Sequence, residues 1–462
     1  MVRLALPIVA SQLGLIAMQT TDVIMLAQLG PAFLAAGSLG FAVYFNVWLF
    51  CLGILIASAS VVAQAYGGRD YRGVRRSVRQ AFWVALTLAV PAMVLVWNGH
   101  HLLLWAGRGA AVAEHTRDYL QAVVWGLPFS FGFLVLRYFV SALSRPKIVM
   151  VALLGGALLN VLLDYLLIFG HFGFPALGVA GAAWATAAIQ VGLFLVLLAF
   201  VLRDRQFRRY HVFARFWKPD WQRYGELWRV GLPVGVTVVA ESGLFLAAQL
   251  LMLRLGTVNV AAHALALQAV AVAFMIPLGV GQAGQVRVGQ HLGAGDHEGV
   301  RRAGWLALVI GCGFMVCTAA TMWLVPEAII GLVLDPADPV DGPVFRLAVS
   351  FLLIAALFQI FDGAQVVMAC SLRGLCDTAW PMALAMTGYW GIGFVAAWLL
   401  AFEAGLGGAG VWYGLATGLA VVALSMTARF ALRRRLGLLE HKPLWTRPGK
   451  VRSRRAVRQA AD

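Results

Sequence analysis

The chain has 462 residues, of which 61% are hydrophobic and only 12% charged, and its mean hydropathy is +0.83. A soluble domain carries about 25% charged residues, so this chain cannot cover a water-facing surface and its solvent must be largely lipid. This composition excludes a soluble enzyme, a nucleic-acid-binding domain and a disordered protein.

Apolar runs long enough to cross a bilayer, which takes about 20 residues, recur along the whole chain. Twelve spans are predicted: 4–29, 39–66, 80–98, 119–143, 148–170, 178–202, 230–255, 262–290, 303–325, 344–370, 380–402 and 408–432. Only three residues precede the first span, which leaves an earlier start codon open. The first run is also longer than the apolar core of a cleaved signal peptide. The predicted fold is an all-α polytopic membrane protein with twelve transmembrane helices.

The net charge of +16 is concentrated in alternate loops. Loops 67–79 and 203–229 and the segment after Arg429 are rich in arginine, whereas loop 171–177 has no Arg or Lys and loop 326–343 is acidic. Cytoplasmic loops of membrane proteins collect Lys and Arg. We therefore expect both termini in the cytoplasm. The heavy use of Arg, Ala and Gly suggests a bacterial genome, and hence the bacterial inner membrane.

The two halves of the chain are similar to each other. Residues 7–76 match the residues 226 positions later without a gap, and 17 of these 70 positions are identical. The register holds through a polar loop, where Gly73–Arg76 matches Gly299–Arg302, which chance matching of apolar sequence does not explain. Six spans in each half give both halves the same orientation in the membrane. We predict two pseudo-symmetric six-helix lobes around a central cleft.

The repeat predicts the domain organisation. The expected parts are an N-terminal lobe (1–202), a basic cytoplasmic connector (203–229), a C-terminal lobe (230–433) and a basic cytoplasmic tail (434–462). The five cysteines form no CxxC pattern, so neither a disulfide scaffold nor a zinc site is implied. No phosphate-binding loop is present, so ATP-driven transport would need a separate subunit.

Four acidic residues lie well inside predicted spans. A carboxylate at the bilayer centre is costly unless it is paired, protonated or hydrated, so Asp22, Asp164, Glu241 and Asp362 are functional candidates. The alternative is a structural acid that joins two helices by hydrogen bonds. Asn160 and Asp164 share one helix face, and two carboxylates held close cannot both ionise easily. The trio of Asp22, Asn160 and Asp164 is therefore a candidate proton site.

The second half supplies a second candidate. Glu241 and Asp362 are hard oxygen ligands that suit Na+ or H+, so they are candidate ligands for a sodium ion. Gln282 and Gln285 either line the cleft or bond helix to helix. Met18 and Met25 fit the lining of a hydrophobic substrate cleft and fit core packing equally well.

Six short segments carry a family resemblance. They are Thr21–Met25, Asn160–Tyr165, Leu232–Glu241, Ala261–His263, Gln359–Asp362 and Ser371–Gly374. In this order, on two six-span halves, they resemble the MATE (multidrug and toxic compound extrusion) family and its NorM-like branch, over about residues 2–435. The resemblance implies a secondary antiporter, not an enzyme, that exports amphipathic organic cations in exchange for Na+ or H+ by alternating access and needs no cofactor.

The resemblance also implies roles for single residues. Archaeal and DinF-like members have a trio matching Asp22, Asn160 and Asp164 in the proton role, and a cation site is implied at Glu241 and Asp362. NorM-like members often have Tyr four residues before the second of these acids, where this chain has Phe358. Its ring can still offer its face to a cation, but a hydroxyl ligand is missing, which favours H+ over Na+.

Two other functions fit the sequence less well than an antiporter. A flippase for lipid-linked precursors on a related fold would need a cationic cleft for pyrophosphate, whereas these spans carry acids. A structural or sensory subunit without transport would not need four intramembrane acids. The expected partners are small organic cations and the lipid bilayer, without nucleic acid or an ATPase subunit, and the chain is expected to be a monomer.

Overall fold

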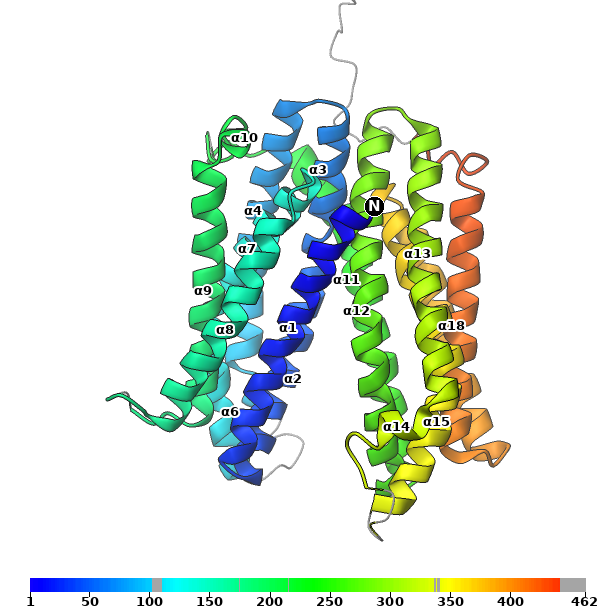
Figure 1. The fold of residues 1–462 in the computed structure, drawn as a ribbon. Coiled ribbons are helices and arrows are strands. Elements are labelled where there is room, and N and C mark those ends of the chain that lie inside the picture. The colour runs from blue at the N-terminus through cyan, green and yellow to red at the C-terminus, as the bar shows by residue number, and fades with distance from the viewer. Residues whose placement is uncertain (102–109, 174, 215, 336–337, 339–340, 441–462) are drawn as a thin grey trace, which may run out of the picture.

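The computed structural model describes residues 1–101, 110–173, 175–214, 216–335, 338 and 341–440, and their regular structure is helical (Figure 1). Most of the predicted tail 434–462 lies outside these residues. Twelve helices of the described residues are long and apolar enough to cross a membrane, which confirms the predicted number. They are Leu4–Gln28, Phe33–Gly67, Tyr71–Trp97, Ala113–Ala142, Lys147–Phe169, Val179–Arg203, Trp221–Arg254, Thr257–Gly293, His297–Leu324, Asp341–Gly374, Ala379–Glu403 and Gly407–Ala431.

The helices of the first half form the N-terminal group, and those of the second half form the C-terminal group. The N-terminal group comprises α1 (Val2–Gln28), α2 (Pro31–Leu55), α3 (Ala57–Gly67), α4 (Tyr71–Trp97), α6 (Ala110–Val123), η1 (Val124–Gly126), α7 (Leu127–Ala142), α8 (Lys147–Phe169) and α9 (Val179–Arg203). The short helix α10 (Arg205–Arg208) follows. The C-terminal group comprises α11 (Trp221–Arg254), α12 (Thr257–Gly293), α13 (His297–Leu324), α14 (Pro326–Ile330), α15 (Asp341–Gly374), α16 (Ala379–Met386), η2 (Thr387–Phe394), α17 (Val395–Trp398), η3 (Leu399–Glu403) and α18 (Gly407–Ala431).

Three helices begin earlier than their apolar runs, inside sequence that was predicted as basic loop. The aspartate before each helix accepts a hydrogen bond from a backbone N–H three residues later: Asp70 from Gly73, Asp220 from Arg223 and Asp296 from Gly299. An N-cap of this kind stabilises the first turn of a helix. Hydropathy detects only the lipid-facing part, so the helical ends in loop 67–79 and in connector 203–229 were missed.

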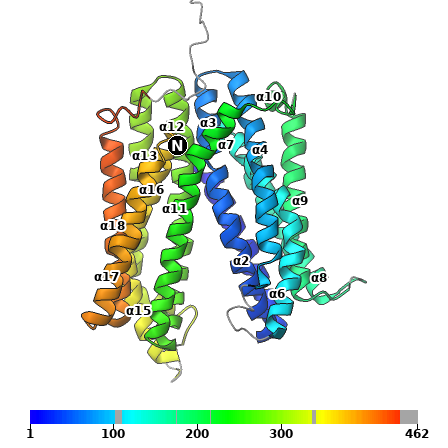
Figure 2. The same cartoon turned by 180° about the vertical axis from the view of Figure 1, so that it is seen from behind.

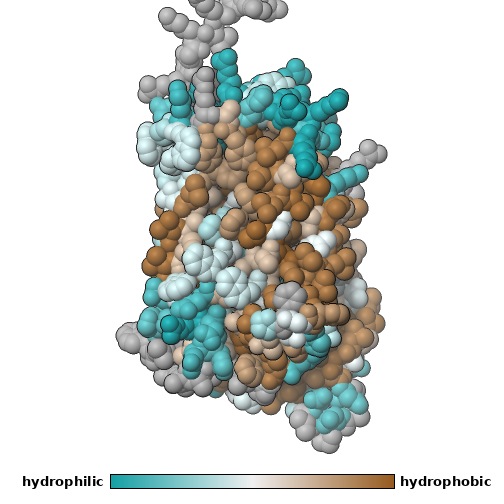
Figure 3. Space-filling model, turned by 90° about the vertical axis from the view of Figure 1, so that its left-hand side faces the viewer, coloured by the Kyte–Doolittle hydropathy of each residue, from teal (hydrophilic) through white to brown (hydrophobic). Residues whose placement is uncertain are grey.

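The two groups of helices lie side by side and diverge from one end of the molecule to the other (Figures 1 and 2). They meet at the end that carries the turns after α3 and α12 and the segment with α10, which we call the basic end. They are farthest apart at the opposite end, near α14 and the start of α2. Hydrophobic residues prevail over the middle of the face seen in Figure 3, and hydrophilic residues gather at its upper and lower ends.

The internal repeat is visible in the contacts between the groups at the basic end. Gln64 of α3 donates a hydrogen bond to the carbonyl of Gly374 at the end of α15, at 2.9 Å. Gln290 of α12, the repeat equivalent of Gln64, donates to the carbonyl of Ala142 at the end of α7, at 2.8 Å, and to the hydroxyl of Ser144 at 3.0 Å. Each residue of this glutamine pair therefore crosses to the other group and binds the end of its fourth span.

Glycines at equivalent positions allow the backbones to approach beside the glutamine pair. A Cβ at Gly67 would collide with the carbonyl oxygen of Gln290, and a Cβ at Gly293 would collide with that of Gln64. Closer to the middle of the spans, Gly53 lies against Gly235, because a Cβ added at Gly53 would lie 2.5 Å from the Cα atom of Gly235. Small residues of this kind let membrane helices pack closely.

The eleventh span departs from an ideal α-helix. It includes two π-helical segments, η2 and η3, which lie against α18. A Cβ added at Gly418 of α18 would lie 2.6 Å from the Cα atom of Gly393, and one at Gly414 would collide with the backbone of Ala397. The wider helix and the glycine face together bring the last two spans into close contact.

Candidate functional site

The first carboxyl pair is assembled from three helices of the N-terminal group. Asp22 comes from α1, Asn160 and Asp164 from α8, and Thr186 from α9. The amide nitrogen of Asn160 donates to Oδ1 of Asp22 at 3.2 Å, and the hydroxyl of Thr186 donates to Oδ2 at 3.3 Å. The three residues predicted as a proton site therefore lie together, although their roles are not tested by their position.

Asp164 is the more buried member of this pair, with none of its surface exposed, whereas Asp22 is partly exposed. Neither oxygen of Asp164 accepts a hydrogen bond of normal geometry from a described residue. The carboxyl of Asp22 lies within hydrogen-bonding reach of it. A proton held between the two carboxyl groups would remove the repulsion of two buried charges.

Polar residues that the sequence analysis missed surround this pair. Thr186 binds Asp22 directly, and Gln190, one turn further along α9, donates to the hydroxyl of Tyr44 at 2.6 Å. Tyr119 is buried and interacts electrostatically with both carboxyl groups. The spacing of Thr186 and Gln190 on one face of an apolar helix was the available signal.

The second carboxyl pair lies in the C-terminal group. Glu241 comes from α11 and Asp362 from α15, and the two interact electrostatically in the folded chain. Asp362 is 3% exposed, and Glu241 is partly exposed. Arg373, near the end of α15, interacts electrostatically with Glu241. None of the ion pairs that the described residues form includes an acid of either pair.

Buried polar groups without hydrogen-bond partners lie at Asp362 of the second pair and beside Trp412, whose ring His263 contacts. Oδ1 of Asp362, both amide atoms of Gln359 and both ring nitrogens of His263 make no hydrogen bond with a described residue. Gln359 precedes Asp362 by three residues, so both lie on one face of α15. Buried polar groups are normally satisfied, which makes this cluster a place where a proton, an ion or water would find ligands.

Phe358 lies one turn before Asp362 and is fully buried. Its ring packs nearly perpendicular to that of Trp412, with centroids 5.6 Å apart, and to that of Phe245 at 6.2 Å. Phe358, which lacks the hydroxyl of a tyrosine, thus belongs to an aromatic cluster beside the second pair.

The described residues contain no group of three or more His, Cys, Asp or Glu side chains that could hold a metal ion. Glu241 and Asp362 are two carboxyl groups, so a sodium ion there would take its remaining ligands from amide oxygens, backbone carbonyls or water.

The remaining candidates lie between helices. Gln285 is 1% exposed and donates to the hydroxyl of Ser60 at 2.9 Å, across the two groups. Gln282 accepts a hydrogen bond from Arg137 at 3.4 Å. Met18 is partly buried against Gly156 of α8, and Met25 is partly buried against the core. These contacts are consistent with the helix-to-helix and packing alternatives, and a role in a substrate cleft stays a prediction.

Comparison with known proteins places this arrangement in a family. The MatE family model matches residues 7–166 and 233–399. The chain is 44% identical to a probable multidrug resistance protein NorM of Mesorhizobium japonicum, over 94% of this chain and 93% of that protein. It is 41% identical to a probable multidrug resistance protein NorM of Pseudomonas aeruginosa, over 93% of this chain and 88% of that protein.

Solved structures share the fold. An outward-facing multidrug resistance MATE family transporter of the MOP superfamily aligns with a TM-score of 0.86 at 20% identity and 96% coverage of each chain. A MATE structure in the bent conformation aligns with a TM-score of 0.85 at 21% identity and 95% coverage of each chain. At these identities the likeness extends to the fold alone.

Proposed function

Because the chain belongs to the MatE (MATE) family of transporters, we propose that it is an antiporter that exports amphipathic organic cations in exchange for H+ or Na+. The observation that carries this proposal is the presence of two carboxyl pairs inside the spans, one in each group of helices. A membrane protein retains such costly groups where they bind ions or substrates. The names of the curated relatives support drugs as the exported substrates.

The first pair is proposed as a proton site. Asp22 accepts hydrogen bonds from Asn160 and Thr186, whereas Asp164 has no donor of normal geometry among the described residues. One proton shared by the pair leaves a single charge, which the donors to Asp22 can stabilise. Proton uptake and release at this place would therefore change the charge of the N-terminal group by one unit.

The second pair is proposed as the site where the coupling cation and the substrate compete. Glu241 is partly exposed and interacts electrostatically with Asp362, whose Oδ1 has no hydrogen-bond partner among the described residues. A cationic drug and a coupling ion would both be attracted to the same carboxylates. Exchange follows if each occupant favours a different conformation, because coupling requires differential affinity for two states.

Alternating access is proposed between two lobes, with boundaries at 1–202 and 230–433 and connector 203–229 between them. The glutamine pair and the neighbouring glycine contacts support a closed basic end, while the helices diverge toward the other end. We assign the basic end to the cytoplasm of a bacterial inner membrane because cytoplasmic loops collect arginine. The state described here would then be closed toward the cytoplasm.

The experiment is transport by the purified chain in proteoliposomes under an isolated H+ gradient or an isolated Na+ gradient. We expect export of a fluorescent organic cation to follow the H+ gradient more strongly, because Phe358 offers no hydroxyl ligand to Na+. Export with neither gradient would contradict cation coupling. Export driven by Na+ alone at fixed pH would retain the antiporter and overturn the preference for H+.

A further inference from the structure

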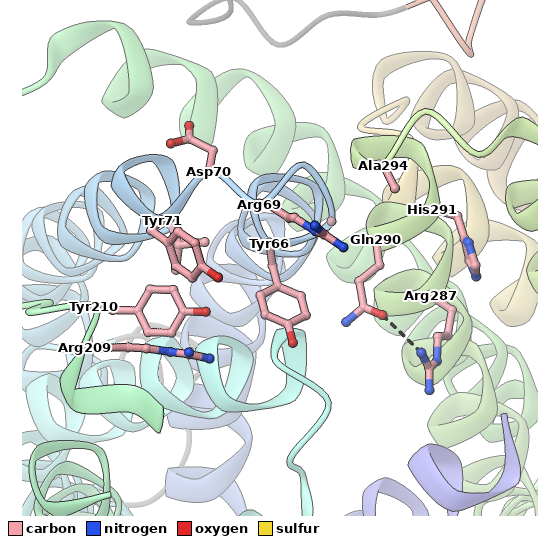
Figure 4. A pocket seen from close by; sticks show the side chains of 12 residues that line it. Tyr66, Arg69, Asp70, Tyr71, Arg209, Tyr210, Arg287, Gln290, His291 and Ala294 are labelled. Carbon is pink, nitrogen blue, oxygen red and sulfur yellow. Dashed lines mark hydrogen bonds between the residues drawn. The ribbon is translucent and has the colours of Figure 1, made fainter. Parts of the chain in front are cut away.

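A cavity of about 350 Å³, whose lining includes basic and aromatic side chains, lies at the basic end, away from both carboxyl pairs (Figure 4). Its volume is in the range of small-molecule sites. Its walls come from both groups of helices and from the segment after α10, and include Tyr66, Arg69, Arg209, Tyr210, Arg287 and Gln290. The cavity therefore spans the contact between the two groups, beside the glutamine pair.

Three arginines line the cavity without a carboxylate partner among the described residues. No ion pair of these residues includes Arg69, Arg209 or Arg287. Arg209 donates to the carbonyl of Gln206 at 3.1 Å, and Arg287 donates to the side-chain oxygen of Gln290 at 3.3 Å. Both retain further N–H donors, since a guanidinium has five.

The acid and the histidine at the rim of the cavity are engaged elsewhere. Asp70 caps α4 through Gly73 at 2.8 Å and lies 3.8 Å from Arg223, and its carboxylate points away from the cavity in Figure 4. Nδ1 of His291 lies 2.9 Å from Oδ2 of Asp296. The charge offered to the interior of the cavity is therefore positive.

Aromatic residues hold one of the arginines in place. The guanidinium of Arg209 lies 5.7 Å from the ring centroids of both Tyr71 and Tyr210, which fixes it by cation–π contacts. Tyr210 is 2% exposed, and its hydroxyl, beside Arg209, makes no hydrogen bond of normal geometry with a described residue. In Figure 4 this hydroxyl points toward Tyr66. A cation and a hydroxyl donor are thus already ordered beside each other.

The fold itself does not require these residues. The repeat equivalents of Tyr66 and Arg69 are Leu292 and Gly295, and the repeat equivalent of Arg287 is Val61. Each half therefore builds the same two spans and turn without the cavity residues that the other half contributes. The basic and aromatic character of the cavity therefore needs an explanation beyond packing.

We propose that this cavity binds a phosphate-bearing anion, and that the anion is the headgroup of an acidic lipid in the leaflet at the basic end. Guanidinium groups match the geometry of phosphate oxygens, and basic pockets between spans on the cytoplasmic side suit acidic headgroups. Tyrosines also concentrate at the level of lipid headgroups. Free phosphate shares this chemistry, and the experiment below separates the two sources.

A bound anion would also connect the two groups of helices. Arg69 lies in the turn after α3 and Arg209 directly follows α10 in the connector, whereas Arg287 lies on α12. An anion that contacts both sides would stabilise the state in which the basic end is closed. This second effect rests on the proposed alternating access, whereas the binding itself does not.

The test is binding of short-chain phosphatidylglycerol to the purified full chain, compared with short-chain phosphatidylcholine and with inorganic phosphate as competitor. We expect preference for phosphatidylglycerol and a loss of about fivefold in affinity for each of Arg69→Gln, Arg209→Gln and Arg287→Gln. Tyr210→Phe, a milder change, should lower affinity by about threefold. Arg72→Gln removes the same charge from an exposed arginine outside the cavity and should have no effect.

Each outcome decides the proposal. Binding of phosphatidylglycerol that resists millimolar phosphate and falls in the cavity variants supports the lipid headgroup. Equal competition by phosphate, with the same loss in the variants, supports the anion site and assigns it to a soluble phosphate. Equal affinity for both lipids, or an equal loss with Arg72→Gln, would overturn the site.

Discussion

Gln64 and Gln290 occupy equivalent positions in the two halves and make equivalent hydrogen bonds, whereas the acids of the two halves do not correspond. In the register of the repeat, Asp22 of the first half corresponds to Ala248, and Glu241 of the second half corresponds to Leu15. The duplicated frame is therefore symmetric where the groups touch and asymmetric where they hold carboxyl groups. The two halves thus share the residues that join the groups, whereas each half carries its carboxyl groups at positions of its own.

The two carboxyl pairs also differ in their surroundings. Asp22 has an amide and a hydroxyl as donors, from Asn160 and Thr186. Asp362 lies among an aromatic cluster and polar groups that have no hydrogen-bond partner among the described residues. The first pair resembles a closed hydrogen-bonded unit that exchanges a proton, and the second resembles an incomplete coordination shell. We therefore expect neutralisation of the acids to change export differently in the two halves.

The largest effect is expected at the second pair. Glu241→Gln and Asp362→Asn each leave only one carboxylate at the second pair, so export should fall more than about tenfold under either ion gradient. Initial export rates in vesicles at matched expression are the measurement. Glu298→Gln, which neutralises a more exposed acid at the start of α13, is the control and should export normally. Near-normal export by both variants would remove the second pair from the mechanism.

A narrower loss is expected at the first pair. Asp164→Asn supplies a permanent neutral partner for Asp22, so the shared proton is no longer needed. Export driven by an H+ gradient should fall to background, and binding of the organic cation should persist. Equilibrium binding and proton-driven export, measured on one preparation, separate the two. Loss of both in equal measure would erase the proposed difference between the halves.

An added ligand should make the second pair more selective for sodium. Phe358→Tyr places a hydroxyl one turn before Asp362, whose Oδ1 has no partner among the described residues. One hydrogen bond or ligand to a buried polar group contributes about 1 kcal/mol, so the apparent affinity for Na+ should rise about fivefold to tenfold. The sodium dependence of export at fixed pH measures this shift. Phe245→Tyr alters the same aromatic cluster from another helix and serves as the comparison.

The smallest effect is expected at the symmetric contact. Gln290→Leu removes the hydrogen bonds to Ala142 and Ser144, which should favour opening of the basic end by about threefold. Cys376 reports this opening through its rate of labelling by a water-soluble thiol reagent, in a variant whose other four cysteines are replaced by alanine. Gln190→Leu, which breaks a hydrogen bond within one group, should leave the rate unchanged. Equal labelling in all three proteins would show that the glutamine pair does not hold this end closed.

The sequence predicted the twelve spans and the pairing of Asp22 with Asp164, because lipid imposes long apolar runs and makes each polar exception conspicuous. It did not predict the partners of Gln64, since Gly374 lies 310 residues away and only packing brings it near. Thr186 escaped notice because threonine in an apolar helix commonly bonds its own backbone. The π-helical segments around Gly391 depend on contact with α18, which local sequence does not encode.

The end of α15 is a candidate fixed point for rotation of this helix, because Gln64 donates a hydrogen bond to the carbonyl of Gly374. At 1.5 Å per residue, Asp362 lies about 18 Å from that fixed point and the far end at Asp341 about 50 Å. A swing of about ten degrees around the fixed point would therefore displace Asp362 by about 3 Å and the far end by about 9 Å. A motion that displaces one ion ligand by about 3 Å would thus be amplified roughly threefold at the opposite side of the membrane.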